Sequence, residues 1–260
     1  MTSAEPTVYL SFDVEEFDLP NECGGSMSLD EQIALGRSGV ETLLPRLEAL
    51  DLSTTLFTTA RFAEHAIDLL APAAQRHEIA SHAVRHDIFD DGDYAASRIS
   101  LQQTLNTPVV GFRRPRLQPI NVTLCRDAGY SYDSSENPIR LPGRYDNRHL
   151  PRTPRLDQGL FRIPISSSPS MRLPLFWLSW GSIPMPILRH ALDRTLEHDG
   201  QLVLFFHPWE FIDLPRTLPM PRLVRRRCGP RLLDRVTSEL RRLKQRAVFK
   251  PMRLMRQPMT

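Results

Sequence analysis

The sequence is poor in cysteine and contains no long apolar run. Its three cysteines, Cys23, Cys125 and Cys228, lie far apart and form no CxxC pair, so a disulfide framework is not expected. No stretch is apolar over enough residues to predict a transmembrane helix. No early window joins a basic flank to a long apolar run, and the first expected strand begins close to Met1, which leaves no room for a signal peptide. We therefore expect a cytoplasmic protein.

The bulk composition is that of a chain that can bury a full core. The 260 residues are 41% hydrophobic and 24% charged, as is typical of globular proteins. A chain of this length suits one large domain or two small ones, and we expect one domain over residues 1–260.

The net charge of +3 hides an asymmetry between the two ends of the chain. Residues 222–260 carry 13 basic and 2 acidic side chains, whereas residues 1–221 carry 20 basic and 28 acidic ones. We expect residues 222–260 to be a basic C-terminal helix and tail, packed on the domain or extending from it. The excess charge is a solvated helix face, a peripheral contact with anionic lipid at the inner membrane face, or a contact for nucleic acid. Phe249 is the one aromatic residue there, which argues against base stacking on single strands.

The order of the expected elements alternates between strand and helix. Apolar and β-branched runs predict strands at 7–13, 53–59, 78–81, 109–112, 129–133, 161–164, 201–206 and 247–249. Helical spacing predicts helices at 29–50, 61–75, 94–105, 121–128, 185–198 and 231–246. Residues 137–159 are rich in Pro, Arg and Asn and predict an extended surface loop. Alternation with near-continuous apolar strands favours an α/β fold with a parallel sheet or barrel.

Polar residues stand where these expected strands end. Asp13 ends the first strand, His82 follows the third, Arg113 follows the fourth, and His207 follows the strand at 201–206. The carboxyl ends of strands carry the functional residues of such barrels. The sequence therefore predicts that these four groups converge on one rim.

Two histidines four positions apart, His82 and His86, are candidate metal ligands. Two imidazoles and a carboxylate that leave coordination positions open form a typical hydrolytic metal site. Asp13 and Glu15 are separated by one residue, so at a strand end they point to the same side. One of these carboxylates can then bind metal while the other acts as a base; the alternative is a solvated acidic turn with Glu16 and Asp18.

A histidine and a group of arginines complete the candidate set. His207 directly follows an apolar strand, where a partly desolvated imidazole can donate a proton to a leaving group. Arg113, Arg114 and Arg116 lie together at another strand end. They hold Asp13 ionised, grip an anionic substrate, or form structural ion pairs.

With these motifs assembled, the chain resembles the polysaccharide deacetylase family, the NodB-homology or carbohydrate esterase 4 group. The resemblance covers about residues 7–214 and rests on four ordered motifs: the acidic strand end, HxxxH, the turn Gly111-Phe112-Arg113-Arg114-Pro115, and the strand that closes on His207. The chain is most similar to a bacterial subgroup with Phe-Asp-Val-Glu-Glu and Phe-His-Pro-Trp-Glu. The resemblance implies a distorted (β/α) barrel of seven or eight strands and a divalent metal, usually zinc.

The resemblance also implies roles for individual residues. His82 and His86 match the metal-binding histidines, Asp13 the catalytic base, Arg113 the arginine that orients it, and His207 the general acid. Many members have adjacent aspartates in the first motif, where this chain has Asp13-Val14-Glu15. Glu15 is then the expected acidic ligand, with Glu16 or Asp13 as alternatives. Two further departures are Ala83, where Ser or Thr is usual, and Arg116, where an aromatic is usual and substrate contacts are expected to differ.

The predicted function is metal-dependent hydrolysis of an N-acyl (acetyl) group on an amino sugar of a glycan or glycan precursor. The alternatives are an amidohydrolase acting on a non-sugar amide, and a catalytically degenerate binding relative. The apolar, Pro-broken run at 171–186 is core packing or a lip that sits on a membrane; the second interpretation favours a lipid-linked or nucleotide-linked amino sugar as substrate.

Overall fold

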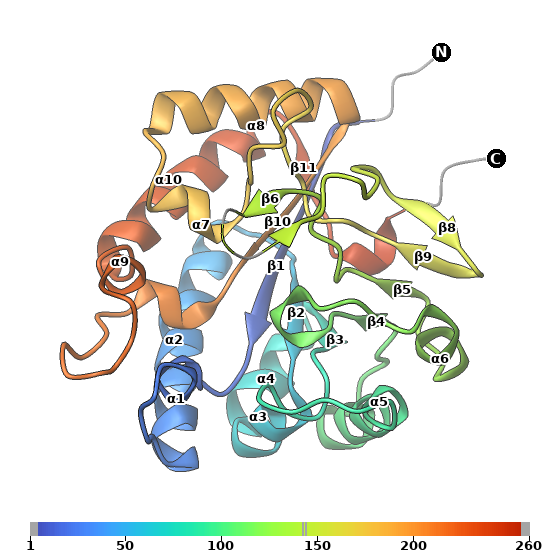
Figure 1. Ribbon diagram of the computed structural model, residues 1–260, viewed down its shortest axis with the longest axis vertical. Coiled ribbons are helices and arrows are strands. Elements are labelled where there is room, and N and C mark those ends of the chain that lie inside the picture. Colours follow the sequence, from blue (N-terminus) through green and yellow to red (C-terminus); the bar gives the residue numbers. More distant parts are fainter. Residues whose placement is uncertain (1–4, 142, 144, 256–260) are drawn as a thin grey trace.

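A curled, mostly parallel sheet forms the centre of the molecule. The computed structural model describes residues 5–141, 143 and 145–255 (Figure 1). Within these ranges the main sheet has nine strands, and all neighbours are parallel except the last pair. Its order is β10 (Gln201–Phe206), β1 (Thr7–Val14), β2 (Thr55–Thr58), β3 (Glu78–Ser81), β4 (Gly111–Phe112), β5 (Tyr132–Asp133), β9 (Leu160–Arg162) and β8 (Arg155–Asp157), and β11 (Val248–Phe249) also pairs with β1.

The sheet bends back toward itself as a half-barrel. The backbone N–H of Ser166, in the extended chain after β9, donates to the carbonyl of Val203 on β10 at 3.0 Å. The two ends of the strand order therefore approach each other, and the strands enclose an interior. This arrangement confirms the predicted distorted (β/α) barrel.

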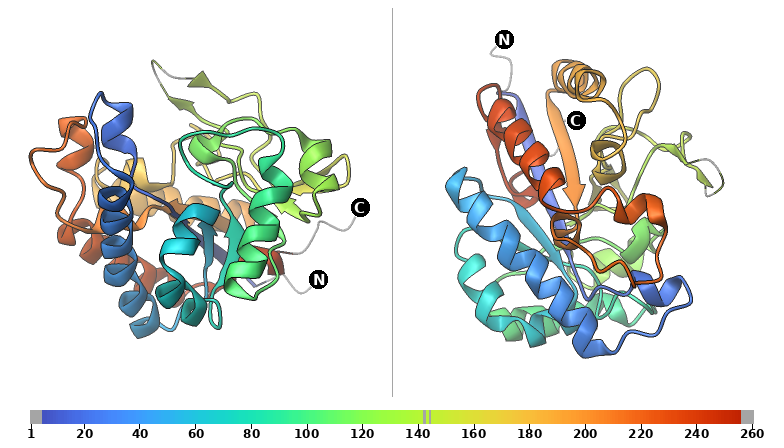
Figure 2. Two further views of the ribbon diagram at one scale, coloured as in Figure 1. Left: turned by 90° about the horizontal axis from the view of Figure 1, so that it is seen from below. Right: turned by 90° about the vertical axis from the view of Figure 1, so that its left-hand side faces the viewer.

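Helices cover the outer side of the curled sheet (Figures 1 and 2). They are α1 (Leu19–Glu22), α2 (Leu29–Ala49), α3 (Ala60–His65), α4 (Ile67–Ala73), α5 (Asp93–Leu105), α6 (Val122–Asp127), α7 (Trp177–Trp180), α8 (Met185–Asp199), α9 (Arg222–Arg225) and α10 (Pro230–Lys244), with the short turns η1 (Pro115–Leu117), η2 (Pro208–Phe211) and η3 (Met252–Leu254). The start of α2 shows how closely sequence sets an element. Ser28 and Glu31 form a reciprocal capping box there, which satisfies backbone N–H groups that a helix start leaves free.

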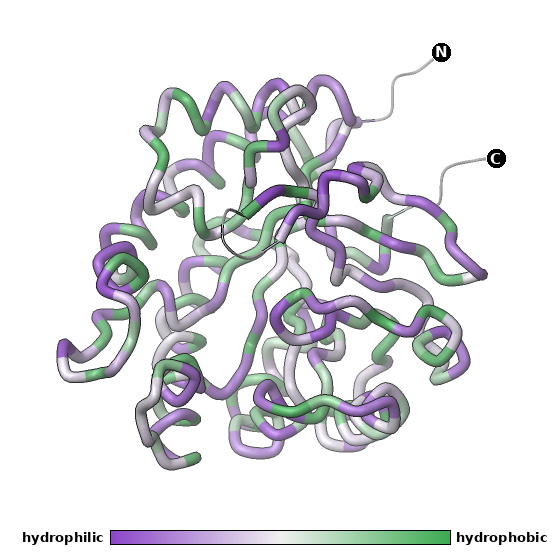
Figure 3. The backbone as a smooth tube through the Cα atoms, in the orientation of Figure 1, coloured by the Kyte–Doolittle hydropathy of each residue, from purple (hydrophilic) through white to green (hydrophobic). Residues whose placement is uncertain are grey.

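Strand alternation sorts side chains between the two faces of the sheet. Along β1, Leu10 and Phe12 join the core between sheet and helices, whereas Tyr9 belongs to a second cluster inside the barrel. Because side chains alternate along a strand, Ser11 and Asp13 share the inner face with Tyr9. Figure 3 shows the hydrophilic segment that follows β1. The alternation of side chains along β1 therefore places the carboxylate of Asp13 inside the barrel.

Two expected elements differ from the structure. The helix expected at 61–75 is two helices, α3 and α4, because Ala66 leaves the helical region at φ −138°. The loop expected at 137–159 contains β8 and a separate antiparallel pair, β6 (Arg140–Leu141) and β7 (Tyr145–Asp146). These strands are only two or three residues long, and the many arginines and prolines around them give a composition typical of a loop.

The basic C-terminal helix packs into the core. Leu233, Val236, Leu240 and Leu243 of α10 are buried against the sheet, so the apolar face of this helix is not available to a membrane. No helix in the described ranges is long and apolar enough to cross a membrane. Residues 256–260 of the predicted tail lie outside the described residues.

The apolar run expected as core packing or a membrane lip is largely core. Leu175, Phe176 and Trp180 are buried, whereas Met171 is 77% exposed. The indole N–H of Trp180 donates to the carbonyl of Leu175 at 3.1 Å. One exposed methionine is a normal surface feature, so the packing supports the first interpretation.

Candidate functional site

The carboxyl ends of four strands bring the predicted residues together. Asp13 lies near the end of β1, and Glu15 follows it on the same inner side. His82 follows β3, Arg113 follows β4, and His207 follows β10. All of them except His207 are less than a tenth exposed. A site assembled in this way can keep water out while one side stays open to a ligand.

Two imidazole nitrogens and one carboxylate oxygen point at the same spot. The Nε2 atoms of His82 and His86 lie 3.2 and 3.3 Å from Oε2 of Glu15. That oxygen is buried and accepts no hydrogen bond from the described residues. The three residues form a group whose ligand atoms all lie within 4.8 Å of one another. A buried oxygen without a donor is costly, and a cation would satisfy it.

The far nitrogen of each ring fixes which nitrogen faces the glutamate. Nδ1 of His82 donates to the carbonyl oxygen of Arg113 at 2.9 Å, and Nδ1 of His86 donates to a carboxylate oxygen of Asp18 at 2.8 Å. In neutral rings the lone pairs of both Nε2 atoms then point toward Glu15. Such outer hydrogen bonds are usual for metal-binding histidines, so the donor set fits a divalent metal.

The electrostatics of the cluster favour negative charge on Glu15. Burial alone would raise the pKa of Glu15, but the neighbouring His86, His82 and His207 outweigh it and lower the pKa to about 2. Burial likewise opposes charging of His86, yet Glu15 and Asp18 raise its pKa to about 9. A proton on His86 and a cation bound to its Nε2 are alternative positive charges that balance the same two carboxylates, those of Glu15 and Asp18. Metal uptake should therefore release a proton.

Asp13 is held by Arg113 beside the two histidines. Nη1 of Arg113 lies 2.5 Å from Oδ1 of Asp13. The other aspartate oxygen, Oδ2, lies 3.9 Å from Nε2 of His82 and 4.0 Å from Nε2 of His207. One oxygen is thus engaged and the other faces the centre of the site.

Arg113 itself is fully buried and well supported. Its guanidinium donates to the hydroxyl of Ser11 at 3.1 Å and to the carbonyl and hydroxyl of Ser134 at 3.0 and 3.1 Å. It also lies 4.0 Å from the ring centre of Phe57. A buried cation needs such partners, and they fix the orientation of the fork that contacts Asp13.

His207 is oriented by a glutamate three residues later in the chain. Its Nδ1 donates to Oε1 of Glu210 at 2.7 Å, which turns Nε2 toward Asp13. Burial would lower the pKa of His207, but the hydrogen bond that it donates to Glu210 and the nearby acids raise the pKa. The rings of Trp177 and Trp209 lie 5.6 and 5.0 Å from the imidazole. A protonated imidazole with apolar neighbours can serve as a proton donor.

Glu16 and Arg114, both weighed in the sequence, lie outside this centre. Both oxygens of Glu16 have other partners, the hydroxyl of Thr59 and the backbone N–H of His86, so its carboxylate does not join the convergent group. Arg114 stacks on Phe89 at 4.3 Å and donates to the carbonyl of Pro119. Of the three arginines, the structure brings Arg113 alone into contact with Asp13.

Arg116, at the position where the sequence resemblance leads one to expect an aromatic residue, makes ion pairs with two acidic side chains. Its guanidinium lies 3.3 Å from Oδ2 of Asp18 and hydrogen-bonds Glu22 at 2.6 Å. Asp18 is the residue that holds His86. Arg116 therefore supports the metal-facing histidine through Asp18 in addition to any contact with a substrate.

Close backbone packing sets the position of two site segments. A Cβ on Gly36 of α2 would lie 2.5 Å from the carbonyl oxygen of Glu15, and one on Gly39 would lie 2.5 Å from the carbonyl carbon of Pro208. Real Cβ atoms do not approach backbone this closely. Glycine at both positions therefore lets α2 touch the segment of Glu15 and the segment after His207.

The turn between the two histidines is strained. Ala83, directly after His82, has φ 69°, a conformation that non-glycine residues rarely adopt and that is common at functional sites. The two histidines thus project from an irregular turn and not from a helix.

Sequence reasoning gave no role to Asp18, Glu210, Ser11 or Ser134. Glu210 stands three residues after His207, and this spacing closes a hydrogen-bonded turn in η2; the pattern H-P-x-E was the available signal. From the sequence, Asp18 is expected only as part of an acidic turn. The two serines reach Arg113 from other strands, and no sequence signal marks them.

No family model and no curated protein sequence matches the chain. Solved structures do. A protein from Mycobacterium smegmatis assigned as a polysaccharide deacetylase has a TM-score of 0.60 at 18% identity, covering 100% of this chain and 97% of that one. A protein from Pseudomonas aeruginosa PAO1, also assigned as a polysaccharide deacetylase, has a TM-score of 0.63 at 15% identity, covering 94% of this chain and 86% of that one. The PuuE allantoinase has 0.61 at 14% identity, covering 95% and 90%. The chain therefore has the fold of the polysaccharide deacetylases, as its ordered motifs predict.

Proposed function

We propose that the protein is a metal-dependent hydrolase that removes an N-acyl group, such as acetyl, from an amino sugar. One observation carries this proposal: Asp13, Glu15, His82, His86 and His207 converge at the carboxyl ends of parallel strands, with a buried Glu15 oxygen that lacks a hydrogen-bond donor. The likeness in fold to polysaccharide deacetylases supports the same reading.

Glu15, His82 and His86 are the proposed metal ligands, and zinc suits such a mixed nitrogen and oxygen set. A divalent cation bound there would supply a Lewis acid that acidifies water and polarises the acyl carbonyl. We assign the remaining chemistry to this chain's own side chains.

Asp13 is the proposed base. Arg113 engages one carboxylate oxygen, and the free oxygen faces the centre, where it can accept a proton from the attacking water. His207 is the proposed acid. Nε2 gives its proton to the amide nitrogen as the C–N bond breaks, so the products are a carboxylic acid and a free amine.

We propose an amino sugar as the substrate because a partly exposed aromatic side chain lies beside the proposed acid. Trp177 is half-buried and lies beside His207, and a partly exposed indole ring suits the apolar face of a pyranose. A lipid-linked or nucleotide-linked saccharide is the finer proposal, with the cytoplasm as the compartment. The buried apolar face of α10 gives no support to a membrane contact, which leaves only the charge of the Arg-rich segment in its favour.

The test combines metal analysis with acetate release. Purified protein should contain about one divalent metal per chain and release acetate from a panel of N-acetylated saccharides and nucleotide-linked N-acetyl amino sugars. His82→Ala should lose metal and activity together. Retained activity in that variant would overturn the ligand assignment.

A second candidate function is hydrolysis of a non-sugar amide by the same residues. The similarity in fold to an allantoinase favours its inclusion. Adding allantoin and simple N-acetyl amides to the panel separates the two candidates. A protein that binds metal but releases no product from any of them would be a degenerate relative that only binds its ligand.

A further inference from the structure

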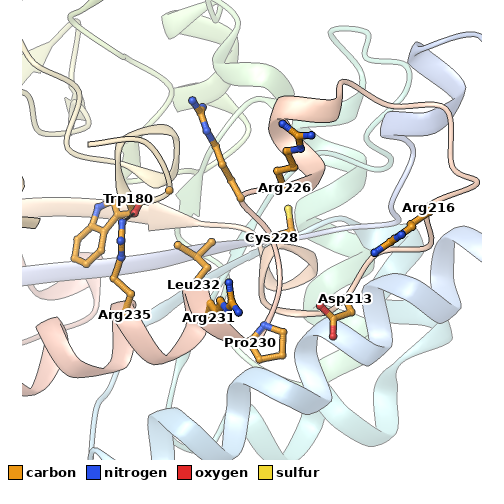
Figure 4. A pocket seen from close by; sticks show the side chains of 11 residues that line it. Trp180, Asp213, Arg216, Arg226, Cys228, Pro230, Arg231, Leu232 and Arg235 are labelled. Atoms are coloured by element: carbon orange, nitrogen blue, oxygen red, sulfur yellow. Dashed lines mark hydrogen bonds between the residues drawn. The ribbon is translucent and has the colours of Figure 1, made fainter. Parts of the chain in front are cut away.

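A cavity lined by arginines lies apart from the predicted site residues. It has a volume of about 690 Å³ and is formed by α7, the loop before α9 and the start of α10. Arg216, Arg226, Arg227, Arg231 and Arg235 line it, together with a single carboxylate, Asp213. Figure 4 shows Arg226, Arg231 and Arg216 arranged around its centre. None of the proposed catalytic or metal-binding residues takes part.

Most of these guanidinium groups are not paired within the protein. Arg235 donates to the carbonyl of Trp180 at 2.7 Å. The side chains of Arg216, Arg226, Arg227 and Arg231 make no hydrogen bond or ion pair with a described residue. Arginines elsewhere are commonly paired, as Arg162 is with Asp133 at 2.9 Å. Uncompensated cations around one hollow repel each other, so the cluster is not explained by folding stability.

The local backbone brings the arginines close together. A Cβ on Gly181 would lie 2.7 Å from Cβ of Arg227, so the absence of a side chain there lets Arg227 pack against α7. Gly229 adopts φ 110°, and its backbone N–H donates to the carbonyl of Glu210 at 2.7 Å. This turn directs the chain from Arg227 into α10 and fixes Arg231 at its first turn. The arrangement is a shaped feature of the fold and not a loose tail.

Cys228, the remaining titratable residue that lines the cavity, does not offset the positive charge of the arginines. Burial raises the pKa of the Cys228 thiol, so this side chain stays neutral. Five arginines against one aspartate call for a ligand with more than one negative charge. Guanidinium forks match phosphate oxygens in pairs, and a cavity of this volume is in the range of small-molecule sites.

We propose that this cavity, the arginine pocket, binds a phosphate-bearing ligand, with a diphosphate as the best match to its charge. The proposal stands independently of the deacetylase assignment, because it uses no residue of the candidate metal site. The two sites are nevertheless neighbours in the fold. Trp180 lines the pocket, and Trp177 of the same short helix contacts the ring of His207.

The direct test is calorimetric titration of the full chain with inorganic pyrophosphate at low ionic strength, after removal of metal with EDTA. We expect saturable binding of one pyrophosphate per chain that weakens as salt is raised. The double variant Arg226→Gln/Arg231→Gln should weaken this binding about tenfold or more. Both side chains are exposed and unpaired, so the variant should fold as the wild type does.

A matched control removes the same charge from the same basic segment. Arg222→Gln/Arg241→Gln changes two exposed arginines outside the pocket and should keep wild-type affinity. Equal losses of pyrophosphate affinity in both double variants would show that binding depends on general surface charge, and this would overturn the proposed pocket. Absence of saturable pyrophosphate binding would overturn it as well.

Two further arms identify the source of the phosphate and separate the sites. Sedimentation with phosphatidylcholine vesicles, with and without phosphatidic acid, tests a lipid headgroup. Binding to the acidic vesicles that requires Arg226 and Arg231 supports that source, whereas pyrophosphate binding without vesicle binding supports a soluble phosphate compound. His82→Ala should bind pyrophosphate like the wild type. Loss of binding in His82→Ala would contradict a pocket separate from the metal site, and a failed deacetylase assay would leave the pocket intact.

Discussion

Asp18 offers the sharpest test of the candidate metal centre, because it contacts His86 and is not one of the three proposed ligands. Its carboxylate accepts the Nδ1 proton of His86 at 2.8 Å and is almost fully buried. Asp18→Asn keeps the size of the side chain and an acceptor oxygen but removes the charge. We expect the variant to bind zinc more weakly, because the imidazole becomes a poorer donor to the cation.

The expected size follows from the type of hydrogen bond that is lost. A hydrogen bond to a charged group contributes about 1.5–3 kcal/mol and a neutral one about 0.5–1.5 kcal/mol. The difference, about 1–1.5 kcal/mol, corresponds to a rise in Kd of roughly 5–13-fold. This lies within or just below the effect of about 10–100-fold that is typical for partners of metal-binding histidines.

The assay is competition for zinc against a chromophoric chelator at fixed pH, and it needs no substrate. Glu22→Gln is the matched control, because Glu22 shares Arg116 with Asp18 but makes no hydrogen bond with His86. Thermal unfolding of both metal-free variants checks that each is folded. Unchanged zinc affinity in Asp18→Asn, or an equal loss in Glu22→Gln, would refute the positioning argument.

The other predictions concern proton transfer and stability. Glu210→Gln removes the anion that favours protonated His207, so the descending limb of the kcat–pH profile should move about one to two units lower; a limb that stays in place would contradict the acid assignment. Arg113→Lys loses the planar fork on Asp13, and we expect kcat to fall roughly 10–100-fold with metal content unchanged, as measured by acetate release and metal analysis. Burial lowers the pKa of His77 from 6.5 to about 4, so the native state binds fewer protons than the unfolded chain between these values and stability falls as pH falls. Urea unfolding should show that His77 accounts for a loss of about 2 kcal/mol between pH 7 and pH 5, and His77→Gln should remove this part of the pH dependence.

The sheet and the placement of the candidate residues were predictable because they follow from periodicity. The strands at 78–81 and 201–206 match β3 and β10 residue for residue. Alternation in β1 put Asp13 and Glu15 on one side, and parallel strands brought His82 and His207 to the same end. These relations depend on local spacing and on the rule that parallel strands share a direction.

The features that were not predictable depend on contacts between distant segments. Asp18 reaches His86 from a turn 68 positions away, and Ser134 reaches Arg113 across 21 positions. The break at Ala66 and the short strands after residue 137 lack any strong propensity signal. The sequence places Asp13, Glu15 and Glu16 at one strand end. Only the packed structure shows that Glu15 faces the two histidines while Glu16 bonds to Thr59 and to the backbone of His86.

The two glycines of α2 carry a consequence for protein engineering. Exchanging Gly36 or Gly39 for alanine is a routine stabilising step, worth up to about 1 kcal/mol in an exposed helix. Here each added methyl group would push the helix off the backbone it touches, at Glu15 in one case and at Pro208 in the other. A substitution that looks stabilising from helix propensity alone would therefore displace the segment that carries Glu15 or the segment that follows His207.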